Sequence, residues 1–553
     1  MFIRTKKSGG HEYLQIVHSE RTGSRVRQRT IATLGRLDRL QQDGAVDALT
    51  VSLAKFSLHT AVLTAHREGR LPAAEARRFG AVAVFERLWE HLGIPKIIEG
   101  LLEDRRFSIP VERVLFVTAL HRLMSPGSDR AAEDWCRSYA IEGIEPLELH
   151  HFYRSMAWLG EPLSEEAQRL ATPFAPRCTK DLIEERLFDW HRDLFTDMSV
   201  VFFDTTSIYF EGGGGESLGQ YGNSKDHRPD LRQMVVGAVI DGAGRPVCCE
   251  MWPGNTTDVK SLVPIVERLR RCFGVRDVCV VADRGMISTQ TVQQLSGAGL
   301  NCRYILGARM RSNSEVAKAV LSRPGRYRQV TPPRTTSEDP SPLKVKEVRV
   351  EGRRYVVCMN DEQARKDRAD REAIVEHLRE QLRQGDKSLV GNKGYRKYLK
   401  TGSGQHFHID AAKLRAEERL DGKWVLATDT DLPAEQVALK YKELWMVEDV
   451  FRSLKSILDT RPIYHRHDET IRGHVFCSFL ALVLLKELYR RMEQRGWRGV
   501  EWNRLKLDLD ELQYFTVDSA GKTFRIRTQT QGDAGKALQA AGVALGPPVT
   551  QVE

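Results

Sequence analysis

The sequence predicts an α/β protein, and three observations lead to that prediction. Apolar runs of strand length alternate with segments in which apolar residues recur every three or four positions, in the order β-β-β-α-β-α-β. Two of these strands, at 200–203 and 278–282, are each followed by an aspartate, Asp204 and Asp283. The strand pattern returns at 424–427, after a long region of different character. We therefore expect an α/β layer that is interrupted by an insertion.

The predicted elements of this layer follow one another closely. Two strands flank a turn at 241–244, where Gly242 and Gly244 favour a reversal of the chain. The next helix is marked by apolar residues at helical spacing between Val259 and Leu269. The full set comprises strands at 200–203, 234–240, 247–252, 278–282 and 303–306, and helices at 259–269 and 289–295.

Length and composition set the outer limits of the prediction. At 553 residues the chain exceeds the size of one hydrophobic core, so several domains or one domain with large insertions are expected. Lys and Arg total 84 against 74 Asp and Glu, a net charge of +10. A positive charge suits a partner that is a polyanion, but basic proteins without such a partner are common.

Cysteines and apolar runs bear on the compartment and on membranes. The nine cysteines show no C-x-x-C spacing, which indicates neither a disulfide framework nor a zinc site. The N-terminus lacks the apolar core of a signal peptide, so we expect the reducing cytoplasm. The longest apolar run, at 475–485, is too short to cross a bilayer and predicts a buried helix.

The N-terminal region predicts a basic β-hairpin. Stretches at 13–17 and 26–34 are rich in β-branched residues and flank the polar turn 21–24. Arg25, Arg27 and Arg29 recur with period two, which places them on one face of a strand. We expect this face to contact DNA phosphates.

The pattern along the rest of the chain divides it into further regions. Helical spacings and several tryptophans predict a helical domain before the α/β layer, whereas the end of the chain is polar and predicts a flexible tail after about Thr516. The predicted divisions are the basic hairpin region (1–60), the helical domain (61–195), the first part of the core (196–308), the insertion (309–422), the second part of the core (423–495) and the C-terminal region (496–553).

The predicted insertion includes a stretch rich in Pro, Ser and Thr at 331–342. It contains a basic hairpin that turns at Glu351 and Gly352, followed by a charged helix that ends near residue 385. Further on, basic residues alternate with tyrosines, as in a groove that follows a nucleic-acid backbone, although a plain basic surface would have the same pattern. The residues that we expect to contact DNA there are Lys393, Tyr395, Arg396 and Lys397.

A helix after Pro433 carries the third candidate carboxylate, Glu448. Tyr441, Glu448 and Lys455 are spaced by seven residues, nearly two helical turns, so they are predicted to lie along one stripe of a long helix. Glu448 would bind metal, with Tyr441 and Lys455 on phosphates of DNA. The spacing is equally compatible with a solvated helix face on which Glu448 pairs with Arg452.

Three carboxylates on separate elements suit the cleavage of a phosphodiester. Two hard cations roughly 3.5–4 Å apart can clamp the attacking and leaving oxygens, and they require carboxylate oxygens that converge from different segments. Asp204, Asp283 and Glu448 meet that requirement, although an aspartate at the end of a strand is also a common turn residue.

Three segments resemble the catalytic blocks of transposases in the insertion sequence 4 superfamily. They are VVFFDTTS, VVADRGMIS and YKELWMVEDVFRSLKSILDTRPIYH, in that order. The third resembles the family signature of tyrosine, two residues, arginine, three residues, glutamate, six residues and lysine, and Tyr441, Glu448 and Lys455 match it. The blocks YLQIVHSERTGSRVRQRTIATLG and IRGHVFCSFLALVL resemble the insertion sequence 1634 group, so the resemblance covers most of the chain.

This resemblance implies a fold and an activity. The fold would be an RNase H-like catalytic core interrupted by a β-rich insertion before the glutamate helix. The protein would bind the terminal inverted repeats of double-stranded DNA as a homodimer on paired ends, nick the DNA with water and transfer the 3′ hydroxyl to target DNA. Asp204, Asp283 and Glu448 would hold two Mg²⁺ ions, for which Mn²⁺ substitutes.

The chain departs from the family signature at one position. Leu444 stands where the signature has arginine, one turn before Glu448. Arg452 lies one turn after Glu448, and its guanidinium is predicted to take over a contact to the same carboxylate or to the same DNA strand.

Two other functions share these residues. One is a catalytically inactive or regulatory protein that binds DNA ends, and the other is a metal-dependent nuclease without strand transfer. The presence of all three carboxylates disfavours the first, and a DNA-joining assay separates the second from a transposase.

Overall fold

A computed structural model of the chain describes most of its residues. The described residues are 2–22, 25–54, 75–145, 147–173, 175–191, 198–297, 300, 302–311, 315–334, 336, 339–384, 398–401, 407–519 and 522–552. The chain divides into two compact units. Unit 1 comprises Met1–Ala83, Arg137–Ile141 and Gly499–Glu553, and unit 2 comprises Val84–Cys136 and Glu142–Arg498.

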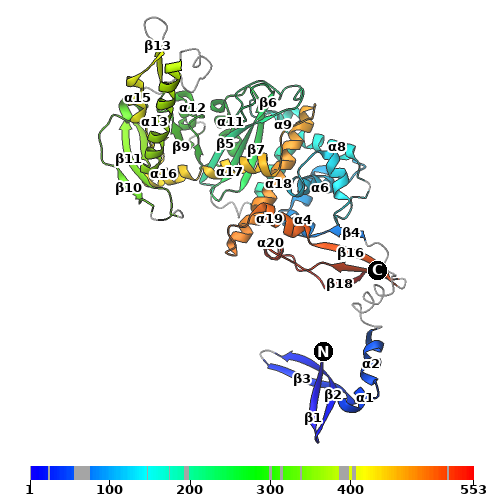
Figure 1. Ribbon diagram of the computed structural model, residues 1–553. Helices are drawn as coiled ribbons and strands as arrows, with labels where there is room; N and C mark the ends of the chain where they lie inside the picture. Colours follow the sequence, from blue (N-terminus) through cyan, green and yellow to red (C-terminus); the bar gives the residue numbers. More distant parts are fainter. Residues whose placement is uncertain are drawn as a thin grey trace. The chain divides into compact units, whose positions relative to one another are not determined.

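The N-terminal part of unit 1 is a three-stranded antiparallel sheet followed by two helices (Figure 1). The register between the second and third strands is regular where His18 faces Arg29 and Glu20 faces Arg27. Arg27 and Arg29 therefore share one face of the strand, and both are exposed. The elements are β1 (Phe2–Ser8), β2 (His11–Thr22), β3 (Arg25–Arg36), α1 (Leu37–Gln42) and α2 (Ala45–Ala54).

The C-terminal part of unit 1 corrects the expectation of a flexible tail. Its strands form a four-stranded antiparallel sheet in the order β18-β17-β16-β4. Val517 and Phe524 face each other across β16 and β17 and are buried, and Leu538 is buried on a nearby helix. The average composition of this region is polar because alternate strand residues face solvent, so it gave no indication of the buried residues between them. The elements are β4 (Glu75–Arg78), α19 (Trp502–Asp510), β16 (Gln513–Ser519), β17 (Lys522–Arg527), α20 (Ala534–Ala541) and β18 (Val549–Val552).

Unit 2 is built on a nine-stranded sheet in the order β10-β11-β12-β15-β9-β8-β5-β6-β7. β8 and β9 run parallel to β5, and the other neighbours are antiparallel. Every strand predicted for the α/β layer is present. The strands are β5 (Val200–Tyr209), β6 (Gln233–Asp241), β7 (Pro246–Pro253), β8 (Cys279–Ala282), β9 (Arg303–Ala308), β10 (Arg328–Thr331), β11 (Leu343–Val350), β12 (Arg353–Met359) and β15 (Lys423–Thr428).

The two helices predicted within the α/β layer are α11 (Asp258–Arg271) and α12 (Thr289–Ser296), and a core forms between the helices and the sheet. Leu262 and Leu269 of α11 are buried in this core with Phe203 of β5. Leu262 and Leu269 belong to the helical spacing that predicted α11, and Phe203 belongs to the continuous apolar run that predicted β5. The mixed α/β class predicted from the sequence is thus confirmed.

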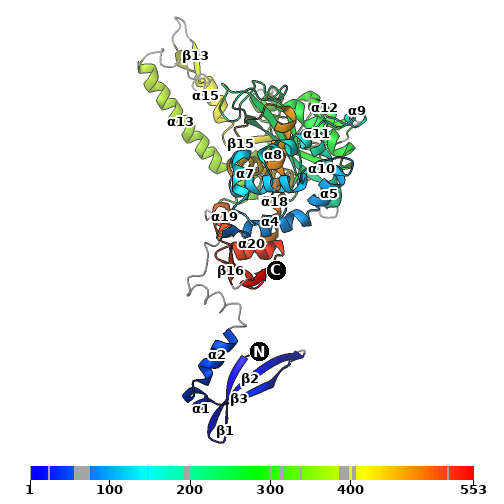
Figure 2. The ribbon, with the colours of Figure 1, turned by 90° about the vertical axis from the view of Figure 1, so that its right-hand side faces the viewer.

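The region 309–422 contributes to this sheet. β11 and β12 are joined by a tight turn at Glu351 and Gly352, which both have a positive φ, as hairpins of this length require. β12 pairs with β15, so the strands of this region continue the sheet that begins with β7. Figure 2 shows α13 (Asp361–Gln384) as a long helix with β13 (Leu399–Thr401) near its end. The remaining elements are η1 (Val316–Val320), β14 (Phe407–Ile409) and α15 (Ala411–Glu418).

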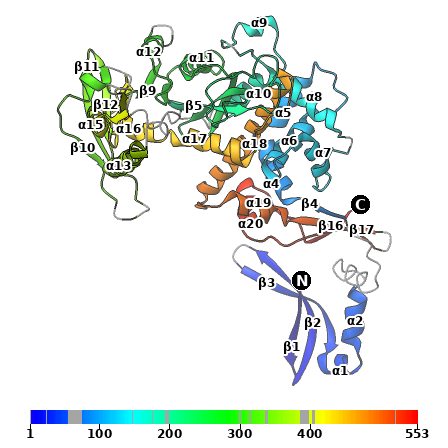
Figure 3. The same ribbon diagram turned by 45° about the horizontal axis from the view of Figure 1, so that its top comes forward.

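Helices before β5 pack around a long apolar helix near the end of unit 2. Figure 3 shows α18 (Asp468–Gln494) beside α6 and α8, and α18 contains the apolar run that predicted a buried helix. Among the described residues, no helix has both the length and the apolarity for a membrane span. The preceding helices are α4 (Gly80–His91), α5 (Ile94–Leu102), α6 (Val111–Met124), α7 (Asp129–Cys136), α8 (Leu149–Gly160), α9 (Glu165–Gln168) and α10 (Thr179–Trp190).

The prediction of a single long helix after Pro433 is wrong. The segment instead forms α16 (Ala434–Lys442), α17 (Trp445–Arg452) and the π-helical turn η3 (Ser453–Ile457). Between α16 and α17 the backbone bonds span three residues, from Leu444 to Tyr441 and from Met446 to Glu443. A tight turn of this kind changes the rotation between successive side chains, so equal spacing by seven no longer fixes one stripe.

Candidate active site

The three predicted carboxylates lie on separate elements of unit 2. Asp283 directly follows β8, as predicted. Asp204 lies in the middle of β5 rather than at its end, because the strand continues for five more residues to Tyr209. Glu448 lies on α17, which packs against β5 and β6 and buries Val447 and Phe451. The opposite face of this short helix leaves Glu448 exposed.

Asp204 has the most perturbed environment of the three carboxylates. Burial, together with the charges of Asp283 and Asp258, raises the pKa of Asp204 to about 6, against the opposing effects of Lys225 and of a backbone hydrogen bond. That bond runs from the backbone N–H of Thr205 to Asp204 Oδ1, at 2.7 Å. A buried carboxyl group beside other carboxylates is an unfavourable place for a lone negative charge and a favourable one for a cation.

Asp283 and Tyr441 are brought together by the fold. The Tyr441 hydroxyl donates to Asp283 Oδ1 at 3.0 Å, and burial beside this carboxylate raises the pKa of Tyr441 well above its ordinary value. The phenol therefore stays protonated, and its O–H donates its one hydrogen bond to Asp283. Gly307 makes this approach possible, because a Cβ there would lie 2.5 Å from the Tyr441 hydroxyl oxygen. The sequence analysis expected this hydroxyl on a phosphate.

Asp283, Tyr441 and Glu448 line one cavity of about 590 Å³. Its other polar walls are basic, since Arg284, Arg309, Arg311 and Lys423 also line it. Arg309 donates to the backbone oxygens of Arg284 and Gly285, which follow Asp283, and so holds this loop. Cations around a carboxylate centre suit a substrate that carries phosphates.

Lys455 and Arg452, both predicted to contact DNA, pair with acidic side chains of this chain. Lys455 Nζ donates to Asp226 Oδ1 at 2.7 Å, and burial lowers the pKa of Lys455. Arg452 is exposed and lies 3.6 Å from Asp449, one turn back, rather than beside Glu448. Leu444, at the arginine position of the family signature, is buried. The structure thus assigns Leu444 to packing.

The remaining predicted DNA contacts are distributed over other regions. Arg27 and Arg29 belong to unit 1, on the exposed face of β3 described above. Arg25 pairs through its backbone with Thr22, and its side chain lies outside the described residues. Lys393, Tyr395, Arg396 and Lys397 also lie outside the described residues.

The sequence analysis missed several residues that surround Asp204. The Thr205 hydroxyl donates to Asp258 Oδ1 at 2.6 Å, and Lys225 Nζ donates to Thr205 O and Oγ1 at 2.7 and 2.8 Å. Lys225 also lies 3.4 Å from Asp258. Asp258 begins α11, where an acidic residue is favourable for the helix alone, so its sequence position carried no signal of a site.

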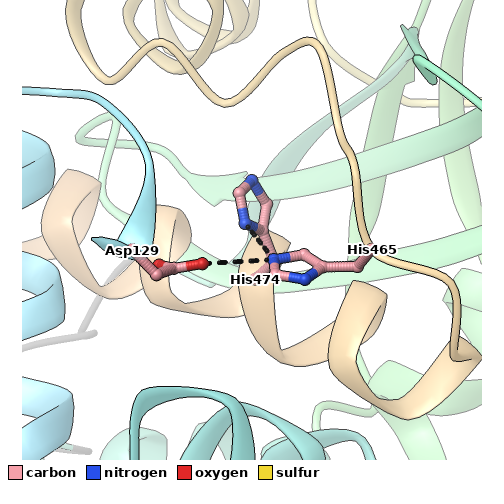
Figure 4. A group of neighbouring side chains, drawn as sticks. All are labelled: Asp129, His465 and His474. Carbon is pink, nitrogen blue, oxygen red and sulfur yellow. Dashed lines mark hydrogen bonds and ion pairs between the residues drawn. The ribbon is translucent and has the colours of Figure 1, made fainter. Parts of the chain in front are cut away.

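Asp129, His465 and His474 form a second cluster of polar side chains (Figure 4). Within the described part of the chain, it is the one group in which three His, Cys or acidic side chains offer ligand atoms within 4.8 Å of one another. Asp204, Asp283 and Glu448 are spaced more widely. In the cluster, His465 Nε2 lies 3.3 Å from Asp129 Oδ2 and 3.1 Å from His474 Nδ1.

The surroundings of this cluster do not favour a metal ion. Arg122 contacts both ring nitrogens of His474, at 3.0 and 3.4 Å, and lies 3.2 Å from Asp129 Oδ1. His474 Nε2 is 3.2 Å from the backbone oxygen of Thr460. Protons and one buried guanidinium satisfy these groups, and a second cation would be repelled by Arg122. We assign the cluster to the packing of α6, α7 and α18.

The fold and the candidate site together define a class of protein, an α/β enzyme whose carboxylates and basic cleft suit phosphodiester chemistry. Comparison with protein families is more specific. Residues 195–484 match the family described as "Transposase DDE domain", and residues 3–60 match "IS1634 family transposase, N-terminal domain". The chain belongs to the DDE transposases, in the IS1634 group. It is a transposase of an insertion sequence, and enzymes of this family generally use divalent metal ions.

Two solved structures are similar to this chain at low sequence identity. A piggyBac transposase synaptic complex with hairpin DNA is 10% identical, with 80% of this chain and 82% of that chain covered and a TM-score of 0.35. A Mos1 transposase paired-end complex with the left transposon end is 14% identical, with 36% and 61% covered and a TM-score of 0.15. A search of the curated proteins found no match.

Proposed function

We propose that this transposase binds the terminal inverted repeats of its element as a homodimer, nicks the DNA and joins the new 3′ end to target DNA. The observation that carries the proposal is the convergence of Asp283, Tyr441 and Glu448 on one basic cavity beside Asp204. The order β7-β6-β5-β8-β9, with β8 and β9 parallel to β5, supports an RNase H-like core in which region 309–422 is the insertion.

Asp204, Asp283 and Glu448 would hold two Mg²⁺ ions, for which Mn²⁺ would substitute. Their oxygen donors suit hard cations, and the pKa of Asp204 is raised by burial and by the charges of Asp283 and Asp258, effects that a bound cation would offset. Bound cations would activate water and stabilise charge on the phosphate during cleavage.

The residues of the chain would supply positioning. Tyr441, by donating to Asp283 Oδ1, would orient this carboxylate and leave Asp283 Oδ2 available to a cation. Arg284, Arg309 and Arg311 on the cavity wall would contact the DNA backbone, together with the predicted arginines of β3 and the basic segment around Lys393.

A joining assay tests the proposal. The protein is incubated with labelled DNA that carries the ends of the element, with a target plasmid and with Mg²⁺, and the products are separated by size. We expect nicked ends and end-to-plasmid joined products. Nicks without joined products would indicate a nuclease, and binding without nicks would indicate a DNA-end-binding protein.

A further inference from the structure

One dipeptide, Lys225–Asp226, contacts the segments that carry Asp204 and Glu448, and reaches the loop after Asp283 through Asp258. It lies in the connection between β5 and β6, which the assigned metal ligands leave without a role. The backbone N–H of Lys225 donates to Ser207 Oγ at 2.8 Å, which anchors the dipeptide on β5. Two adjacent side chains of opposite charge then extend to different parts of the site.

The Lys225 side chain contacts the segment of Asp204 directly and the loop after Asp283 through Asp258. Its ammonium group has three N–H donors, and Thr205 O and Oγ1 accept at 2.7 and 2.8 Å. Thr205 is the neighbour of Asp204 and donates its backbone N–H to that carboxylate. Lys225 also pairs with Asp258, whose Oδ2 lies 3.2 Å from where a Cβ of Gly285 would be, two residues after Asp283.

The Asp226 side chain reaches the segment that carries Glu448. Its Oδ1 accepts from Lys455, seven residues after Glu448, and pairs with Arg461. The Asp226 side chain is 6% exposed, and its Oδ2 accepts no hydrogen bond from any residue that the structure describes. A buried carboxylate with one unsatisfied oxygen costs free energy, which packing alone does not explain.

We propose that Lys225 and Asp226 are positioning residues that set the relative placement of Asp204, Asp283 and Glu448. This inference rests on the proposed metal site. Backbone groups hold this region without the two side chains, because the Lys225 N–H donates to Ser207 Oγ, and backbone bonds join Ile463 to Tyr209 and Glu211 at the end of β5. Loss of either side chain therefore leaves the fold in place and loosens the carboxylates.

Replacing Lys225 separates positioning from simple electrostatics. Lys225→Met removes a positive charge near Asp204 and Asp258, so electrostatics alone predicts tighter binding of a divalent cation. A positioning role predicts weaker binding, because the carboxylates would no longer be held in place relative to one another. Substitution of residues that orient metal ligands typically lowers metal affinity by about 10–100-fold. The sign of the change decides between the two.

The test measures Mn²⁺ binding to the full chain by the loss of the free-ion electron paramagnetic resonance signal. We expect Lys225→Met to weaken binding by about tenfold and Asp226→Asn to weaken it as well. Thr205→Val, which removes the hydroxyl without changing charge, should behave like Lys225→Met, and Thr205→Ser should restore binding. Asp230→Asn, in an exposed ion pair on the same connection, is the control and should have no effect.

The outcomes bear separately on the two proposals. Unchanged or tighter binding in Lys225→Met, with the melting temperature of wild type, overturns the positioning role. If Lys225→Met does not fold, unchanged binding in the folded Thr205→Val variant overturns it. Asp204→Ala is measured alongside, and Mn²⁺ binding that survives this change removes the proposed metal site and with it the inference.

Discussion

Replacing Asp204 with asparagine should stabilise the metal-free protein at neutral pH. In the folded chain the pKa of Asp204 is raised to about 6, against an ordinary value of 3.8. The contribution of Asp204 to the free energy of unfolding is therefore most favourable below about pH 4, and it is lost as the pH rises through about 6. At pH 7.5 the wild-type carboxylate is charged and buried, whereas an asparagine is neutral at every pH.

The size of this effect follows from the two pKa values. The interval between 3.8 and about 6 corresponds to about 3 kcal/mol, and partial exposure of the side chain reduces this to about 1–2 kcal/mol. Because unit 2 is larger than the domains for which 1 kcal/mol shifts the melting temperature by roughly 2–4 °C, we expect a rise of about 1–3 °C.

Thermal denaturation in EDTA measures this rise. Wild type and Asp204→Asn are compared from pH 5 to pH 8, with Asp230→Asn as the control, because Asp230 is exposed and its pKa is lowered by Arg228. The difference should grow with pH, and divalent cations should reverse it by stabilising only wild type. Equal melting temperatures of wild type and Asp204→Asn at pH 7.5 in EDTA would refute the conclusion that the charged Asp204 carboxylate destabilises the metal-free protein.

Three further predictions concern the cavity, the glutamate helix and the N-terminal sheet. Gly307→Ala should displace the Tyr441 hydroxyl and lower cleavage by at least tenfold in a nicking assay, whereas Gly213→Ala, in open space, should leave it unchanged. Arg452→Ala should lower cleavage sharply with little change in melting temperature if this arginine replaces that of the family signature; cleavage near wild type would exclude the idea. Replacing the three arginines at the start of β3 with alanine should weaken end binding and reduce the slope of its salt dependence by the equivalent of about three phosphate contacts. An unchanged slope in a fluorescence-anisotropy titration would show that these arginines do not contact phosphates.

Short-range patterns predicted the sheet well. Apolar runs bounded by turn residues gave β5 to β9, because burial on both faces of a central strand requires an almost continuous apolar run. Asp283 could be located at the end of β8 for the same reason. β5 was predicted too short because Thr205, Thr206 and Ser207 are polar, yet they are buried and pair with β6.

Contacts between distant segments could not be predicted from spacing. Lys225 meets Thr205 and Asp258, and Asp226 meets Lys455, across separations of 20 to 229 residues. Each residue alone fits an ordinary explanation, as a loop charge or as the first residue of a helix. The single long helix through Tyr441, Glu448 and Lys455 was wrong for a local reason, since no proline or glycine marks the tight turn between α16 and α17.

The polar C-terminal region shows the limit of composition as a signal. In β16 and β17 apolar residues alternate with polar ones, and the alanines and the leucine of α20 provide further buried apolar residues. Composition averages over this alternation and therefore indicated disorder.

The most direct test of the account compares nicking and end binding for wild type and for Asp204→Ala, Asp283→Ala and Glu448→Ala. Each protein is incubated with labelled element ends and Mg²⁺, nicked product is quantified on a denaturing gel, and end affinity is measured in the same samples with Ca²⁺. The account predicts that each substitution abolishes nicking while end affinity stays within about threefold of wild type, because each removes a metal ligand and not a phosphate-contacting cation. Nicking that survives any one of the three substitutions would contradict the assignment of the active site.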